Sequence, residues 1–458
     1  MKYLSSFIIL VIGASHIANA QVNDDTLKQP STTSQYTAAS EPGFDAAAPY
    51  TAQHNLAAVR IGPGDSKVGY ETKNYKTDSR AIEARRGETA NLIRLVNQPP
   101  LGLPPIPQPK DNPITEEKIA LGKKLFFDRR LSLNDTFSCA MCHIPEQGFT
   151  SHELEKAVGF EGRSNKRNSP TLYNSAYLKK LFHDNRETTL EDQIWGPLLA
   201  RNEMAMPSIG EVINKIKSIS DYKGLFEAAF NGQTVSIENL GKAIATYQRV
   251  LVSGNSNFDK WYFGQQEDAI SAQAKRGFEL FKGKAQCIVC HQMKEKTALF
   301  TDNKLHNTGI GFINSMGQPP EKERMLIAPG IYADVKLSKR KLVGHPPIPD
   351  LGFYEVTQNP ADRWKYRTPG LRNVALTQPY MHDGSMQDLL TVVEFYNKGG
   401  IRKNEAGFPN QSFSPLMNPL NLSQQEMLDI VAFMETLTGD NIAEIISDAF
   451  ATPVGDTQ

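Results

Sequence analysis

The chain contains two Cys-x-x-Cys-His motifs, which together use all four of its cysteines. The motif residues are Cys139, Cys142, His143, Cys287, Cys290 and His291. Two thiols at this spacing can form thioether bonds to one porphyrin, and the adjacent histidine then falls beneath the iron as its proximal ligand. The sequence therefore predicts two covalently attached haem c groups and a protein with redox chemistry.

Two other uses of four cysteines deserve comparison with haem attachment. Two Cys-x-x-Cys pairs can hold a structural zinc ion, and an exported chain can form two disulfides from them. Neither alternative gives a role to the histidine that follows each pair. Haem attachment explains both histidines, and we therefore favour it.

The N-terminus has the pattern of a secretory signal peptide. Lys2 supplies a positive charge, residues 7–14 are mostly apolar, and residues 18–20 read Ala-Asn-Ala, a typical cleavage site. We expect residues 1–20 to be removed, so that the mature chain begins near Gln21 in a Gram-negative periplasm, where haem attachment is completed. An uncleaved membrane anchor is the alternative. No later stretch is apolar for long enough to span a bilayer.

The charge of the chain is balanced, with 50 Lys and Arg against 50 Asp and Glu. A neutral chain without a long basic run is a poor match for nucleic acid or for an anionic membrane surface. Neither is therefore expected as a partner.

Composition and repetition divide the remainder into three parts. Residues 21–108 are rich in Ser, Thr, Gln, Ala and Pro, which predicts a poorly structured, Pro-rich extension. Further on, Gly-Lys-Lys-Leu-Phe precedes the first haem motif and Gly-Phe-Glu-Leu-Phe precedes the second, both on segments with helical apolar spacing. The repeat predicts a mainly α fold with two cytochrome c-like haem domains packed against each other, at residues 109–262 and 263–458. Amphipathic helices are expected at 238–252 and 423–437.

Residues 109–440 resemble the bacterial dihaem cytochrome c peroxidase superfamily, which includes MauG. The shared motifs are Leu-Gly-x-x-Leu-Phe-Phe-Asp before the first haem, Arg167-Asn-Ser-Pro-Thr, Leu190-Glu-Asp-Gln-x-x-Gly-Pro, Glu203-Met, Arg367-Thr-Pro-x-Leu-Arg-Asn and Pro379-Tyr-Met-His-Asp-Gly. The resemblance implies a peroxidase that reduces hydrogen peroxide at its N-terminal haem and transfers electrons through its C-terminal haem.

The resemblance also implies three residues above the N-terminal haem. Glu203 matches a distal glutamate that acts as acid and base, Gln193 a distal amide that hydrogen-bonds peroxide, and Pro197 a proline that shapes the pocket. In classical members a histidine on the loop after the first motif blocks this iron, and Phe160 stands at that place here. We therefore expect an iron whose sixth position is open, as in MauG-like enzymes. His152, in the same loop, matches the blocking position poorly.

The sixth ligand of the C-terminal haem is the most discriminating position. Classical relatives have a methionine fourteen residues after the histidine of the His-Asp-Gly motif, whereas MauG-like proteins have a tyrosine there. Counting from His382 reaches Tyr396, with Met381 and Met386 as alternatives. A phenolate favours ferric and higher states and a thioether favours ferrous iron, so Tyr396 implies storage of oxidising equivalents.

Two further positions follow from the resemblance. His183 replaces the tryptophan that lies between the haems in relatives, and imidazole is harder to oxidise than indole, so conduction through this residue should be weaker. Movement of His183 onto the open iron is an alternative. Asn168, Thr377 and Pro379 match the ligands of an interhaem Ca²⁺, which hard oxygen donors suit.

The sequence leaves three functions to compare. The leading one is a MauG-like enzyme whose high-valent haem pair oxidises a dedicated periplasmic protein or a small cytochrome or cupredoxin. The second is a classical cytochrome c peroxidase that detoxifies peroxide with electrons from a small cytochrome c. The third is a non-enzymatic electron carrier, which would have no use for a distal Gln193 and Glu203. Classical relatives are often dimers, so a homodimer is an open expectation.

Overall fold

The computed structural model describes residues 66–68, 76–78, 87–152, 154–316, 322–328, 331–336 and 349–451. The predicted signal peptide and most of the predicted extension lie outside these ranges. All described residues belong to one unit, residues 56–458. Within the described ranges, no helix combines the length and the apolar character needed to cross a membrane.

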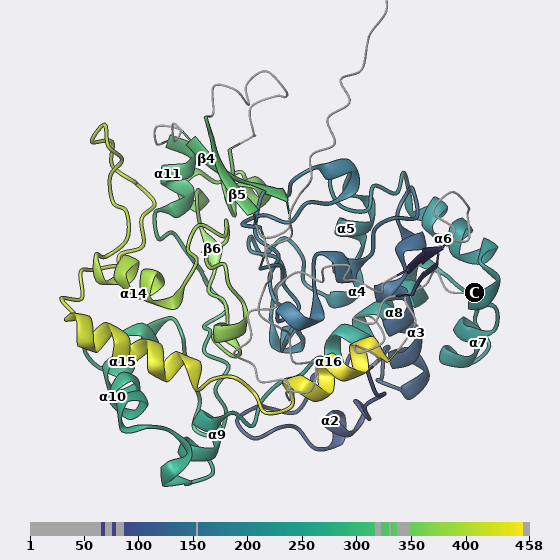
Figure 1. Ribbon diagram of the computed structural model, residues 1–458, viewed down its shortest axis with the longest axis horizontal. Helices are drawn as coiled ribbons and strands as arrows, with labels where there is room; N and C mark the ends of the chain where they lie inside the picture. Colours follow the sequence, from purple (N-terminus) through teal and green to yellow (C-terminus); the bar gives the residue numbers. More distant parts are fainter. Residues whose placement is uncertain are drawn as a thin grey trace, which may run out of the picture. The chain divides into compact units, whose positions relative to one another are not determined.

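Helices form most of the regular structure, which confirms the mainly α class (Figure 1). They are α2 (Arg94–Asn97), α3 (Glu116–Phe127), α4 (Leu190–Gln193), α5 (Trp195–Leu199), α6 (Ile209–Ser218), α7 (Leu225–Ala229), α8 (Ile237–Val250), α9 (Asn257–Tyr262), α10 (Ala272–Lys282), α11 (Ile310–Met316), α13 (Tyr354–Thr357), α14 (Leu389–Asn397), α15 (Gln424–Glu435) and α16 (Ile442–Phe450). Long loops and short 3-10 turns connect them.

Three small antiparallel strand pairs occur among the described residues, and the sequence pattern did not predict them. They are β1 (Ser66–Val68) with β2 (Lys76–Asp78), β3 (Leu305–His306) with β6 (Tyr366–Arg367), and β4 (Lys322–Ala328) with β5 (Ile331–Lys336). Strands β1, β2, β3 and β6 have only two or three residues, which is too short for an alternating pattern to be recognised. Strand β4 is longer, but its sequence, Lys-Glu-Arg-Met-Leu-Ile-Ala, does not alternate between polar and apolar residues.

The repeated glycine before each haem motif marks a close helix crossing. A Cβ on Gly122 of α3 would lie 2.0 Å from the Ala243 carbonyl oxygen of α8, and one on Gly277 of α10 would lie 1.8 Å from the Asp429 carbonyl oxygen of α15. Figure 1 shows α10 and α15 side by side. Because no other residue leaves room for such an approach, the two glycines let each haem motif follow a tightly packed helix pair.

The two predicted amphipathic helices are present at nearly the predicted bounds. Ser236 caps α8 and Ser423 caps α15, each hydroxyl accepting a hydrogen bond from a backbone N–H of the first turn. At α15 the Glu426 carboxylate accepts a hydrogen bond from the backbone N–H of Ser423, which completes a capping box. These caps explain why both helices begin where they do.

Separate hydrophobic cores surround the two helix pairs. Two of the cores contain buried residues of α3 and α8, and a third core contains buried residues of α10 and α15. The end of the predicted extension joins the first: Leu92 and Leu95 are buried against Ile445 of α16. Residues 87–108 are therefore anchored to the folded unit.

A buried ion pair between Arg372 and Asp259 also contacts the Pro-rich stretch, at Gly102. The Arg372 guanidinium donates two hydrogen bonds of 2.7 Å to Asp259 and one of 2.9 Å to the Gly102 carbonyl oxygen. Arg372 and Asp259 are 2% and 0% exposed. A buried charge pair at this junction requires both partners, because either one alone would be an uncompensated charge.

Candidate active site

The two predicted proximal histidines have matching environments. The Nδ1 atom of His143 lies 3.0 Å from the Phe149 carbonyl oxygen, and that of His291 lies 2.9 Å from the Phe300 carbonyl oxygen. Burial lowers the pKa of both imidazoles. Each neutral ring donates from Nδ1 to its carbonyl and presents Nε2 as an axial ligand, so both histidines fit haem iron.

The carbonyls that orient these histidines are held by an unusual backbone conformation. Phe149 and Phe300 both have φ of 52°, in the left-handed region, and both side chains are fully buried. This conformation costs a non-glycine residue about 1–3 kcal/mol. The hydroxyls of the next residues, Thr150 and Thr301, donate to backbone carbonyls and help to hold the turn. The same device therefore supports both proximal ligands.

The four cysteines lie on two short 3-10 turns, Cys139–Met141 and Cys287–Val289, and on the residue that follows each turn. Burial raises their pKa, to about 12 for three of them and about 11 for Cys290. Among the described residues, the group of three side chains placed to share a metal ion is Cys290 with Asp302 and His306. This group contains only one of the four cysteines, so it does not bring the two cysteine pairs together at one zinc site.

A structural duplication relates the segments that follow the two haem motifs. Residues whose numbers differ by 199 have the same conformation: Asn174 and Asn373 are both left-handed, with φ of 62° and 60°. The segments also exchange reciprocal hydrogen bonds of 2.8 Å, from Asn168 N–H to the His382 carbonyl and from Arg367 N–H to the His183 carbonyl. His183 and His382 are therefore equivalent positions at the junction of the two halves.

The duplication gives Pro197 and Tyr396 equivalent places, each fourteen residues after its histidine and each on a helix, α5 or α14. Burial raises the pKa of the Tyr396 phenol, and the nearby Cys287 and Cys290 raise it further. The structure thus brings Tyr396 beside the second haem motif. Met386 pairs through its backbone with Tyr380, at the base of the turn that contains Met381.

The Glu203 carboxyl lies near the first haem motif. Its charge contributes to raising the pKa of the Cys139 and Cys142 thiols, after the larger effect of burial. Burial raises the pKa of Glu203 itself, and the positive charge of Arg186 acts in the opposite direction. A partly buried carboxyl with a raised pKa is suited to take up and return a proton.

The backbone brings the other predicted distal residues toward Glu203. The Pro197 carbonyl accepts a 3.1 Å hydrogen bond from Met204 N–H, which closes the chain between α5 and Glu203. Gln193 ends α4, directly before α5. Gln193 and Pro197 thus lie on two consecutive short helices, and Glu203 lies in the loop that follows them.

Phe160 lies in the loop that carries the blocking histidine in classical relatives. Its side chain is buried, and its backbone N–H donates a 2.9 Å hydrogen bond to the Glu203 carbonyl. A Cβ on the preceding Gly159 would lie 2.8 Å from the Glu203 Cα, so glycine allows this close approach. His152 is half-buried, and its Nε2 contacts the Leu376 carbonyl.

His183 is half-buried and lies between the two halves. Its Nε2 lies 3.0 Å from the Asn168 carbonyl oxygen. Burial lowers its pKa to about 3, with further lowering by Arg167 and His382. A neutral imidazole in this hydrogen bond is held in place, which disfavours its movement onto an iron.

An aromatic residue that the sequence reasoning missed lies beside this junction. The rings of Tyr366 and His382 stack with 3.5 Å between centroids and 15° between planes. The Arg167 guanidinium lies 5.5 Å from the Tyr366 ring centre and also pairs with Asp350 and Asp184. Tyr366 lies one residue before the Arg-Thr-Pro motif, but nothing in the motif indicated the stack.

The predicted calcium ligands lie on segments that approach each other. Asn168 donates from its amide to the Glu155 carbonyl, and from its backbone to the loop at His382. Thr377 lies against the turn at Gly148, where a Cβ would be 3.2 Å from its methyl group. Pro379 follows two residues later. Oxygen donors from these segments suit Ca²⁺ by chemistry, and the site remains a prediction.

Comparison with known proteins identifies the family. A family model described as di-haem cytochrome c peroxidase matches residues 116–267. The methylamine utilization protein MauG of Methylorubrum extorquens is 39% identical over 339 residues, which cover 74% of this chain and 83% of that protein. The cytochrome-c peroxidase IdrP1 of Pseudomonas sp. (strain SCT) is 36% identical, covering 76% of this chain and 88% of the relative.

Solved structures agree with these sequence relatives. The crystal structure of a MauG-like protein associated with microbial copper homeostasis superposes with a TM-score of 0.60 at 30% identity, and covers 78% of this chain and 97% of that one. The diheme peroxidase BthA from Burkholderia thailandensis, at 22% identity and a TM-score of 0.58, shares the fold. The chain therefore belongs to the dihaem cytochrome c peroxidase and MauG superfamily, and it is a haem peroxidase-type oxidoreductase with the haem c cofactors that this family implies.

Proposed function

We propose that this enzyme is of the MauG-like type, reducing hydrogen peroxide at an open N-terminal haem and then oxidising a protein or redox partner. The observation that carries this proposal is the position of Phe160, buried and hydrogen-bonded through its backbone to Glu203. A phenyl ring has no lone pair for iron. The loop that would deliver a blocking histidine delivers an apolar side chain instead.

The residues above this haem have the chemistry that peroxide reduction requires. The haem, when bound at His143, supplies the iron that binds peroxide. The Glu203 carboxylate takes the first peroxide proton and returns it to the departing oxygen, while Gln193 hydrogen-bonds the substrate and Pro197 limits the space. The raised pKa of Glu203 favours this return of the proton, because a buried carboxyl holds its proton more readily than an exposed one.

The C-terminal haem favours storage of oxidising equivalents over rapid acceptance of electrons. We assign Tyr396, together with His291, as a residue that would hold the iron of the C-terminal haem, on the basis of its closeness to Cys287 and Cys290 and its equivalence to Pro197. Anionic phenolate lowers the reduction potential of a haem relative to a thioether. A dedicated protein substrate or a small cytochrome or cupredoxin would then be oxidised at the surface.

Several features accompany this assignment as parts of the proposal. The protein acts in the periplasm after removal of residues 1–20, and the halves that carry the haems meet near residues 262 and 263. Asn168, Thr377 and Pro379 hold a Ca²⁺ ion at the junction. His183 is a structural residue there, with a limited role in conduction between the haems.

Stoichiometric hydrogen peroxide added to the fully ferric, haem-loaded protein tests the proposal. Stopped-flow absorbance should show a prompt reaction that needs no prior reduction, because the N-terminal iron is open. If the reaction starts only after one haem has been reduced, a ligand blocks the iron. The protein would then function as a classical cytochrome c peroxidase.

A further inference from the structure

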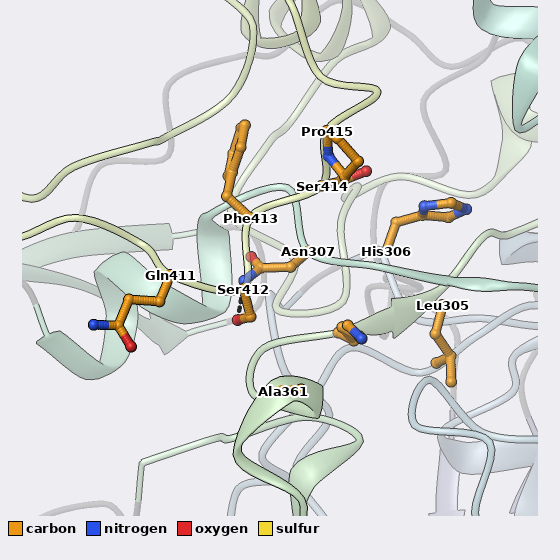
Figure 2. Close-up of a pocket in the computed structure, with 10 residues that line it drawn as sticks. Leu305, His306, Asn307, Ala361, Gln411, Ser412, Phe413, Ser414 and Pro415 are labelled. Carbon is orange, nitrogen blue, oxygen red and sulfur yellow. Dashed lines mark hydrogen bonds between the residues drawn. The ribbon is translucent and has the colours of Figure 1, made fainter.

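A polar pocket lies beside the second haem motif and has no role in the proposed peroxide chemistry. It has a volume of about 300 Å³, the lower end of the range typical of small-molecule sites. Three segments form it: residues 305–307, a turn that includes Ala361 and Lys365, and residues 411–415 (Figure 2). The pocket is distant in sequence from Glu203 and belongs to the half that carries Tyr396.

One wall of the pocket connects it directly to the haem attachment point. His306 lines the pocket, and its Nε2 lies 3.8 Å from the Cys290 Sγ and 3.0 Å from an Asp302 carboxylate oxygen. These three groups could hold a metal ion, but the Cys290 sulfur is the one that a thioether bond uses. A molecule in contact with His306 is therefore separated by one side chain from the Cys290 sulfur, which would attach the second haem.

The walls indicate the chemistry of the ligand. None of the described lining residues carries a carboxylate, and the one lysine, Lys365, is paired with Asp362 at 3.0 Å. Asn307 and Ser412 form a hydrogen-bonded pair, at 2.9 Å, in the same wall. The pocket thus combines hydroxyl and amide groups with little net charge, which favours a neutral ligand that carries hydroxyls.

Two aromatic side chains also line the pocket, Phe413 and His306, which lie on opposite sides of Asn307 and Ser412 (Figure 2). Because His306 donates from Nε2 to Asp302, its Nδ1 carries a lone pair that can accept a hydrogen bond. A hydroxyl on an aromatic ring can donate to this nitrogen while the ring contacts Phe413. A small dihydroxybenzene has both features, and it is also an electron donor.

We propose that this pocket binds a small, neutral hydroquinone-type reductant and admits its electrons to the C-terminal haem through the His306 and Cys290 wall. The inference rests on the proposed peroxidase function. One hydroquinone gives up two electrons and two protons and becomes the quinone. Hydrogen peroxide accepts the two electrons and two protons, its O–O bond breaks, and two water molecules form.

Binding can be tested without turnover. Resorcinol has the same size and two hydroxyls but does not form a stable quinone, so calorimetric titration of the ferric holoprotein with resorcinol reports binding alone. We expect one saturable site per chain. Ala361 and Gln411 are exposed, so Ala361→Trp or Gln411→Trp should fill the pocket without disturbing the core and weaken binding by about tenfold or more. Ala228→Trp, exposed on α7 outside the pocket, is the matched control and should bind like wild type.

Equal binding by wild type and both pocket variants, or no saturable binding by wild type, would overturn the proposal. Peroxide-dependent oxidation of hydroquinone separates this failure from failure of the proposed function. The pocket variants should raise KM for hydroquinone and leave the stoichiometric reaction with peroxide unchanged. If wild type fails to react with peroxide at all, the proposed function is wrong, whereas unchanged KM in both variants refutes only the pocket.

Discussion

Replacing Glu203 with glutamine should remove the proton transfer step and leave the pocket otherwise intact. The backbone of this residue is fixed by hydrogen bonds with the Ala200 carbonyl and the Phe160 N–H, neither of which involves the side chain. Glutamine has nearly the same size as glutamate but cannot take up and return a proton. Loss of a positioned general acid and base typically costs about 10²–10⁴-fold in rate, which raises the barrier by ~3–5 kcal/mol.

The pH dependence of the reaction with peroxide provides a second test of the role of Glu203. Burial raises the pKa of Glu203 above its ordinary value of 4.5, and the proton-accepting form is present only above the raised pKa. The rate of the wild-type reaction should therefore fall as the pH decreases through that raised value. Arg186 acts to lower the pKa of Glu203, so Arg186→Met should shift the acid limb to higher pH. Glu203→Gln should lack the limb altogether.

Stopped-flow absorbance of the ferric holoprotein with hydrogen peroxide, recorded across pH, measures both effects. Glu279→Gln, an exposed glutamate paired with Lys282, is a suitable control and should react like wild type. A Glu203→Gln variant with a wild-type rate and a wild-type acid limb would refute the assignment of Glu203. The haem spectrum of each variant shows whether cofactor loading is unchanged.

Three further changes test other parts of the account. Phe160→His should supply an imidazole that blocks the N-terminal iron, so that peroxide reacts only after partial reduction of the protein; unchanged reactivity would show that this loop does not reach the iron. Tyr396→Met should raise the potential of the C-terminal haem in a spectroelectrochemical titration, and an unchanged potential would exclude Tyr396 as the ligand. Arg372→Met should lower the free energy of unfolding by about 3–5 kcal/mol, because it strands the buried Asp259. Denaturant titration measures that loss, and Arg163→Met, which removes an ion pair with the exposed Glu161, should barely change stability.

The sequence predicted the features that depend on local spacing. The haem motifs, the mainly helical class and the helices capped by Ser236 and Ser423 all follow from short patterns. The glycines at 122 and 277 were visible as a repeat, but their role in helix crossing needed coordinates, because the partner residue lies on a distant helix.

Other features could not be predicted because they depend on contacts between segments far apart in the chain. The reciprocal hydrogen bonds at His183 and His382 join residues about 200 positions apart. Both segments contain a His-Asp pair, but the sequence alone does not show that their backbones bond to each other. The Tyr366 stack and the His306 contact with Cys290 also form only when the loops are assembled. Phe160 was identified by its place in the loop, while its bond to Glu203 became evident only in the structure.

The electron paramagnetic resonance spectrum of the resting, fully ferric holoprotein tests the central claim most directly. An open N-terminal iron and a C-terminal iron with two axial ligands predict one high-spin and one low-spin ferric signal of equal intensity. Two low-spin signals would show that both irons carry two axial ligands at rest. That result would contradict the open pocket beneath Glu203 and Phe160, and with it the MauG-like function.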